Sequence, residues 1–153
     1  MAANSSSRAV GAGRVLVLVY GILALAATGR SVFQIIDRFS EAPLAFSLSA
    51  LSALVYIVAT VALIAPGPVW YRVAWITIGF ELLGVLVIGT VSVVSPAALG
   101  LTSVNPFGRD STVWSAYGLG YLLIPLVLPV LGLLYLRSRR PSSPDVVHSD
   151  VPA

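Results

Sequence analysis

Four long apolar stretches, separated by short polar or proline-rich connections, set the pattern of the chain. The third is the clearest, because from Val73 to Val94 it is apolar except for small hydroxyls and one carboxylate, Glu81. A helix needs about 20 apolar residues to cross the hydrocarbon core of a bilayer. Each stretch therefore predicts a membrane-spanning helix, and the predicted spans cover residues 14–37, 44–65, 72–94 and 113–136.

The connections contain the residues that usually end helices. Ser40 to Pro43 predicts a short turn, and Pro66 to Pro68 predicts a tight connection after the second span. Residues 96–112 form the longest connection, which we expect to fold against the membrane face. Pro125 and Pro129 lie inside the fourth span and predict a kink or a wide turn. The prolines fit either a static kink or a hinge at a broken-helix binding site.

Composition supports an all-α fold: a polytopic membrane protein with a four-helix transmembrane bundle. Of 153 residues, 58% are hydrophobic and only 10% are charged, which is outside the range of ordinary soluble domains. The chain has no cysteine, which excludes a disulfide and a cysteine-based metal site. We expect residues 1–13 and 137–153 to be disordered cytoplasmic tails, since both are rich in small and polar residues.

The first span has two interpretations. Arg8 and Arg14 precede a short apolar run that ends at Ala24–Ala26, as in a signal peptide with a cleavage site. Alternatively, the helix continues past Arg30 with an amphipathic end, and the periodicity of the following residues favours this uncleaved helix. The polar positions on one side of that end are Arg30, Gln34, Asp37 and Arg38.

The positive charge is distributed unequally between the two sides of the predicted bundle. All nine basic residues are arginines, and they flank the apolar runs, so we expect membrane orientation rather than nucleic-acid binding. Because cytoplasmic segments carry the excess of positive charge, both termini should be cytoplasmic, in agreement with four spans. One side carries Arg8, Arg14, Arg72, Arg137, Arg139 and Arg140, and the other carries Arg30, Arg38 and Arg109.

Three of the predicted helices have a face of small and weakly polar residues, and such faces favour close helix contact. At 100° per residue, the second helix aligns Ser49, Ser52, Tyr56 and Thr60. The third aligns Thr77, Glu81, Gly84, Ile88 and Ser92, and the fourth aligns Gly118, Tyr121, Pro125, Pro129 and Gly132. The candidate intramembrane polar site consists of Glu81, Tyr56, Tyr20, Thr77 and Tyr121.

Depth in the membrane narrows the choice of partners for Glu81. At 1.5 Å per residue, Glu81 and Tyr56 lie about 13 Å, and Tyr20 about 9 Å, from the cytoplasmic ends of their helices. Arg30 lies about 24 Å from that end, so an ion pair with Glu81 requires tilt or offset. We therefore expect hydroxyl partners for Glu81. An intramembrane carboxyl group is a candidate proton or cation site, or it locks the third helix to its neighbours.

A second candidate cluster lies at the outer face and consists of Arg30, Gln34, Asp37 and Arg38. It could hold a lipid head group, or it is a solvated helix end. The sequence has no glycine-rich phosphate loop, no metal-ligand spacing and no catalytic triad with its members on one side. We therefore expect no enzyme, no catalytic residue, no metal and no cofactor.

Five segments of the chain have a recognisable residue pattern: Arg14–Gly21, Glu41–Ala45, Val73–Trp75, Phe80–Thr90 and Tyr121–Leu134. Together they resemble small four-span integral membrane proteins of actinobacteria, and the resemblance covers nearly the whole chain except the tails. It implies a bacterial plasma-membrane protein, and it implies no activity and no site residues.

The function that we expect is a non-catalytic membrane component or assembly partner. The alternative is a small transporter or proton-coupled permease that uses Glu81. The expected partners are the lipid bilayer and either another membrane protein or a second copy of the chain, without nucleic acid.

Overall fold

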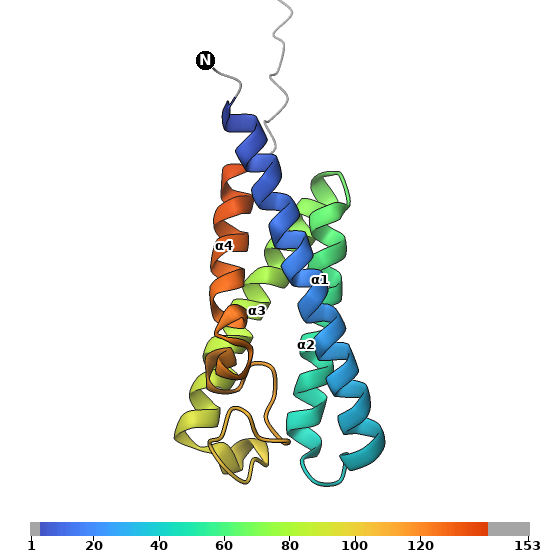
Figure 1. Ribbon diagram of the computed structural model, residues 1–153, viewed down its shortest axis with the longest axis vertical. Helices are drawn as coiled ribbons and strands as arrows, with labels where there is room; N and C mark the ends of the chain where they lie inside the picture. The colour runs from blue at the N-terminus through green and yellow to red at the C-terminus, as the bar shows by residue number, and fades with distance from the viewer. Residues whose placement is uncertain (1–3, 141–153) are drawn as a thin grey trace, which may run out of the picture.

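The computed structural model describes residues 4–140, and these residues form helices and no strand (Figure 1). The predicted all-helical fold is confirmed for this part of the chain. The elements in order are α1 (Asn4–Arg38), α2 (Pro43–Ile64), α3 (Pro68–Val94), two short 3₁₀ helices, η1 (Pro96–Leu99) and η2 (Ser115–Tyr121), and α4 (Ile124–Ser138).

The first helix is longer than the sequence pattern predicts. It begins at Asn4, although a disordered tail is expected through residue 13. Extending an existing helix costs far less than nucleating one, so the stable apolar span can carry additional turns of small residues. The predicted C-terminal tail falls mostly on residues 141–153, which lie outside the described residues; of the rest, Arg137 and Ser138 form the end of α4.

Three helices are long and apolar enough to cross a membrane: residues 11–38 of α1, α2 and α3. The fourth helix, predicted over residues 113–136 with a kink or a wide turn, is α-helical only over Ile124–Ser138, so its predicted start at Val113 is wrong. Helix α4 has 15 residues, about 22 Å, and the hydrocarbon core is about 30 Å thick. The preceding helix η2 is bent from α4 by 98°, so the described chain has four spans only if this pair counts as one.

The break before α4 has an identifiable backbone cause. Leu122 and Leu123 have left-handed φ angles of 58° and 60°, which no helix tolerates. Pro125 then occupies the first turn of α4, where its missing N–H leaves no hydrogen bond unmade. The ring of Pro125 packs on Gly118, where a Cβ atom would come within 2.7 Å of the ring. The predicted wide turn is thus confirmed next to Pro125, as a complete break in the helix, whereas Pro129 lies inside α4 without interrupting it.

The start of α1 and the end of α4 lie at the same end of the bundle, which we call the terminal end (Figure 1). There, Gly13 packs against the ring of Tyr135, and the hydroxyl of Tyr71 donates a hydrogen bond to the Leu136 carbonyl at 2.8 Å. This bond joins the start of α3 to the end of α4.

The opposite end, which we call the loop end, is closed by residues 95–112. Leu99 and Leu101 are buried there against Ala42 and Phe46 at the start of α2. The connection therefore folds onto the bundle.

Large apolar side chains are exposed on every long helix. Leu25 of α1, Leu54 of α2, Ile76 of α3 and Leu134 of α4 are each more than half exposed. Soluble monomers rarely expose contiguous apolar surface on this scale, so these faces are typical of a protein that contacts lipid.

Candidate functional site

Glu81 lies near the middle of α3, and no part of it is exposed. The hydroxyl of Tyr20, also fully buried, donates a hydrogen bond to Glu81 Oε2 at 2.7 Å. The other carboxyl oxygen, Oε1, is buried and has no hydrogen-bond partner. The expectation of a hydroxyl partner is therefore confirmed, whereas the alternative ion pair with Arg30 is wrong because Arg30 bonds elsewhere.

A second hydrogen bond lies beside the first. The indole Nε1–H of Trp114 donates to the hydroxyl of Tyr56 at 3.1 Å, and both side chains are almost fully buried. The rings of Tyr20 and Tyr56 are 6.3 Å apart between centroids. We call Tyr20, Tyr56, Glu81 and Trp114 the interior cluster, which joins α1, α2, α3 and the segment before η2.

The segment that carries Trp114 enters the bundle because α3 has small residues where it packs. A Cβ atom on Gly84 would lie 2.7 Å from the Trp114 ring, and one on Gly89 would lie 2.6 Å from the Tyr117 ring. The Ser92 hydroxyl accepts a hydrogen bond from the Ala116 amide at 2.8 Å. This is the face of α3 that the sequence predicts as internal. The segment that packs on it is the one around η2, before the start of α4.

Two predicted members do not join the interior cluster. Thr77 and Tyr121 are half-buried, and neither bonds Glu81, whose one hydrogen-bond partner is Tyr20. Trp114 was missed by the sequence analysis. The only feature of the sequence that indicates an internal role for Trp114 is its polar ring N–H inside an apolar stretch. Its hydrogen-bond partner, Tyr56, lies 58 positions earlier in the chain.

The arrangement limits what the interior cluster can do. It contains one carboxyl group, two phenols and one indole, without a second acid or a base nearby. Because Glu81 is fully buried, proton or ion exchange with solution would require the bundle to open. The contact between Tyr20 and Glu81 does, however, join α1 directly to α3 across the core.

The second candidate cluster lies at the loop end and divides into two parts. Arg30 points onto the long connection, where its Nη2 donates to the carbonyls of Gly108 at 3.0 Å and Ser111 at 2.7 Å. The amide Nε2 of Gln34 donates to the Arg109 carbonyl at 3.1 Å. For Arg30 and Gln34, the interpretation as a solvated helix end is therefore wrong, because both fix the connection to α1.

Asp37 and Arg38 lie nearer the surface. Arg38 Nε is 3.3 Å from Asp37 Oδ2, and Arg38 Nη1 is 3.4 Å from Glu41 Oε2. Both carboxylates are about half exposed, so these ion pairs contribute little to stability.

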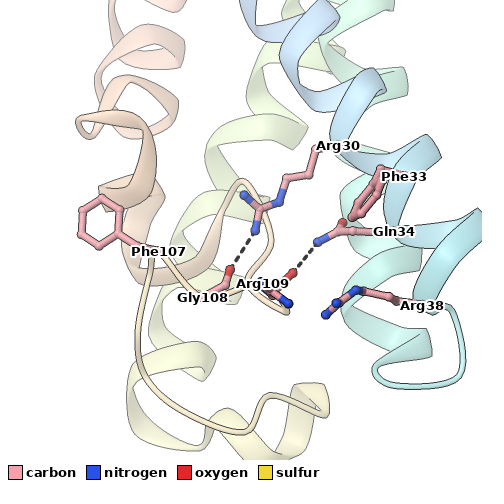
Figure 2. Close-up of a pocket in the computed structure, with 7 residues that line it drawn as sticks. All are labelled: Arg30, Phe33, Gln34, Arg38, Phe107, Gly108 and Arg109. Carbon is pink, nitrogen blue, oxygen red and sulfur yellow. Dashed lines mark hydrogen bonds between the residues drawn. The ribbon is translucent and has the colours of Figure 1, made fainter.

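A pocket of about 420 Å³ opens between α1 and the connection, and we call it the loop-end pocket. Figure 2 shows the side chains of Arg30, Gln34 and Arg38 extending from α1 toward the part of the connection that contains Gly108 and Arg109. The pocket is lined by Arg30, Phe33, Gln34, Arg38, Phe107, Gly108 and Arg109.

We looked for a metal site in the structure and for similarity to known proteins. Within residues 4–140, no three His, Cys, Asp or Glu side chains are grouped so that they could hold a metal ion. No protein-family model, curated protein or solved structure matches the chain.

Proposed function

We propose that the chain is a four-span integral protein of the bacterial plasma membrane, with both termini in the cytoplasm. The segment with η2 and α4 would act as one broken span, since α4 ends at the terminal end, where α1 begins. Charge supports the orientation: Arg14 and Arg139 line one pocket at the terminal end, whereas Arg30, Arg38 and Arg109 line another at the loop end. The bacterial assignment rests on the sequence resemblance alone.

The interior cluster supports an uncleaved first helix. Tyr20 supplies the one hydrogen bond to Glu81, and cleavage after Ala26 would remove it. The carboxyl group would then lose both its partner and the α1 residues packed in the same core, and an acidic side chain without a partner at this depth of a membrane is costly. Helix α1 is accordingly part of the folded bundle in this proposal.

The biochemical role that we propose is that of a non-catalytic membrane component, which assembles with another membrane protein or with a second copy of itself. The observation that carries this proposal is the complete burial of Glu81 against Tyr20. Glu81 is the one acidic side chain in the apolar middle parts of α1, α2 and α3. Its contact with Tyr20 serves to hold α1 against α3. The exposed apolar helix faces supply the surface for assembly.

The test is purification of the tagged full-length chain from its native membrane in lipid nanodiscs, followed by mass measurement of the intact particle. We expect a fixed stoichiometry with a partner or a homo-oligomer, unchanged by Glu81→Gln, which keeps the side-chain shape and an acceptor for Tyr20. A monomer without a partner, from which Glu81→Gln removes a cellular phenotype at normal protein level, would contradict the proposal.

A transporter remains the second candidate, because Glu81 Oε1 is buried without a hydrogen-bond partner and could accept a proton or a substrate donor. Carbodiimide labelling separates the two proposals. Labelling of Glu81 in intact membranes, with protection by an added substrate, favours transport. Absence of labelling until the protein is unfolded favours the structural role.

A further inference from the structure

The loop-end pocket contains two arginines whose charge is not balanced by the chain. Arg38 faces both Asp37 and Glu41. In contrast, no carboxylate within residues 4–140 lies in ion-pair distance of Arg30 or Arg109, because the salt bridges there involve Arg38 alone. Two guanidinium groups without a carboxylate partner, one from α1 and one from the connection, attract an anion, and guanidinium binds phosphate oxygens especially well.

Two residues that line the pocket have buried polar atoms without a hydrogen-bond partner within residues 4–140. Gln34 is only 2% exposed, and its side-chain Oε1 has no hydrogen-bond partner. The Nε–H of Arg30 is buried and unpartnered too, although its Nη2 makes three hydrogen bonds to the connection. Buried polar groups are satisfied in most folded proteins. An acceptor anion that also carries a hydroxyl would supply partners for both the arginine donor and the amide oxygen.

Two aromatic rings place an apolar surface beside these charges. Phe33 and Phe107 line the same pocket and are 60% and 72% exposed. On α1 the neighbouring Val32 and Ile36 are also more than half exposed. A bound molecule could therefore place its charge among the arginines and its apolar part along α1, which is the chemistry of a lipid rather than of a small inorganic ion.

We propose that the loop-end pocket binds the phosphate of an anionic phospholipid whose head group carries a free hydroxyl. Arg30 and Arg109 provide the positive charge, Gln34 accepts from the head-group hydroxyl, and Phe33 and Phe107 contact the glycerol backbone and the first acyl carbons. The bound lipid would hold the connection against α1, at the place where Arg30 and Gln34 already fix it.

The test is titration of the full-length protein in neutral detergent with short-chain phosphatidylglycerol, compared with short-chain phosphatidylcholine and with inorganic phosphate. The variant is Arg109→Gln, since the Arg109 side chain is exposed and only its backbone carbonyl serves the fold. The matched control is Arg72→Gln, an exposed arginine at the opposite end. We expect saturable phosphatidylglycerol binding, weakened about tenfold by Arg109→Gln and unchanged by Arg72→Gln.

Further measurements distinguish binding of a lipid phosphate from binding of inorganic phosphate and from unspecific attraction to the positive surface. Phe107→Ala should weaken phosphatidylglycerol binding and leave any binding of inorganic phosphate unchanged, because the ring contacts only the apolar part. Equal affinity for phosphatidylcholine would contradict a role for the net charge. Equal weakening by Arg72→Gln would indicate diffuse surface attraction. Inorganic phosphate that binds as tightly as the lipid would contradict a lipid site.

Discussion

At the scale of single residues, the buried carboxyl group of Glu81 and the hydroxyl of Tyr20 depend on each other. An acidic side chain at the centre of a membrane-spanning helix costs about 2.5–3.5 kcal/mol on insertion scales. A buried polar group that loses its hydrogen-bond partner costs about 1–3 kcal/mol. The bond from Tyr20 is therefore of the right size to offset most of the cost of placing Glu81 in the core, provided that both helices are in place.

Tyr20→Phe tests this dependence. It removes only the hydroxyl, so the ring still fills the core, but Glu81 then loses its one hydrogen-bond partner. We expect the free energy of unfolding in mixed micelles to fall by about 1–3 kcal/mol. Ser47→Ala is the control, because it removes an exposed hydroxyl that bonds only the Pro43 carbonyl of its own helix, and it should change stability by less than about 0.5 kcal/mol.

The double variant Tyr20→Phe, Glu81→Met identifies the source of the loss, because methionine, unlike glutamine, offers Tyr20 no strong acceptor. If the two side chains act as a pair, the losses of the single variants should not add, and the coupling energy should be about 0.5–3 kcal/mol. Strict additivity would show that the hydrogen bond contributes nothing to the stability of the bundle.

At the scale of elements, the last apolar segment is divided, and its aromatic first part enters the bundle. The segment with Trp114 and Tyr117 packs on Gly84 and Gly89 of α3, and α4 starts only after the turn at Leu122 and Leu123. The division has a cost in backbone strain, since left-handed conformations of non-glycine residues cost about 1–2 kcal/mol each. Burial of the Trp114 side chain opposes that cost.

Gly84→Ala should loosen the contact with this segment. The new methyl group would meet three atoms of the Trp114 ring at 2.7–3.0 Å, so the ring must move, and overpacking of this kind costs about 1–3 kcal/mol. Gly79→Ala is the matched control on the same helix, because nothing lies within 4 Å of its added methyl group. Thermal unfolding of both variants measures the difference, and equal melting temperatures would contradict the packing described.

Leu122→Gly should stabilise the fold or leave it unchanged, although it removes a large apolar side chain. Leu122 is 85% exposed and has a φ of 58°, so glycine relieves strain without opening the core. Leu134→Gly, at an exposed position within α4, should instead cost about 1 kcal/mol through its low helix propensity. Destabilisation of the same size by both variants would indicate that the turn at residue 122 is not strained.

The sequence predicts the three long helices well because their apolar runs are continuous and are ended by proline or charged residues. It also predicts the buried stripe of α2, where Ser49, Ser52 and Tyr56 are fully buried. It fails for the fourth span, because apolar composition does not distinguish a straight helix from a segment that turns back into the core. The left-handed residues at this turn are leucines and not glycines, so Pro125 marks a change of direction but no residue marks a complete break.

The loop-end pocket could be predicted only in part. Arg30, Gln34 and Arg38 share a helix face by periodicity. The partners of Arg30 and Gln34 are Gly108, Arg109 and Ser111, which lie 75 or more positions away, in a connection whose path depends on tertiary packing.

At the scale of the whole molecule, the two ends of the bundle differ. The terminal end gathers arginines and a bond between α3 and α4, whereas the loop end is covered by a connection that α1 holds in place. Three spans would put these ends of the chain on opposite sides of the membrane, and four put them on the same side. Whether the broken segment crosses the bilayer therefore decides the topology of the protein.

Single-cysteine accessibility tests this topology most directly, and the natural chain has no cysteine to interfere. The variants are Gly11→Cys at the start of the first span, Ser138→Cys at the end of α4 and Ser103→Cys in the connection, all at exposed positions. With a membrane-impermeant maleimide added to one side of sealed vesicles, we expect positions 11 and 138 to react together and position 103 to react only from the other side. Reaction of position 138 together with position 103 would contradict the four-span bundle.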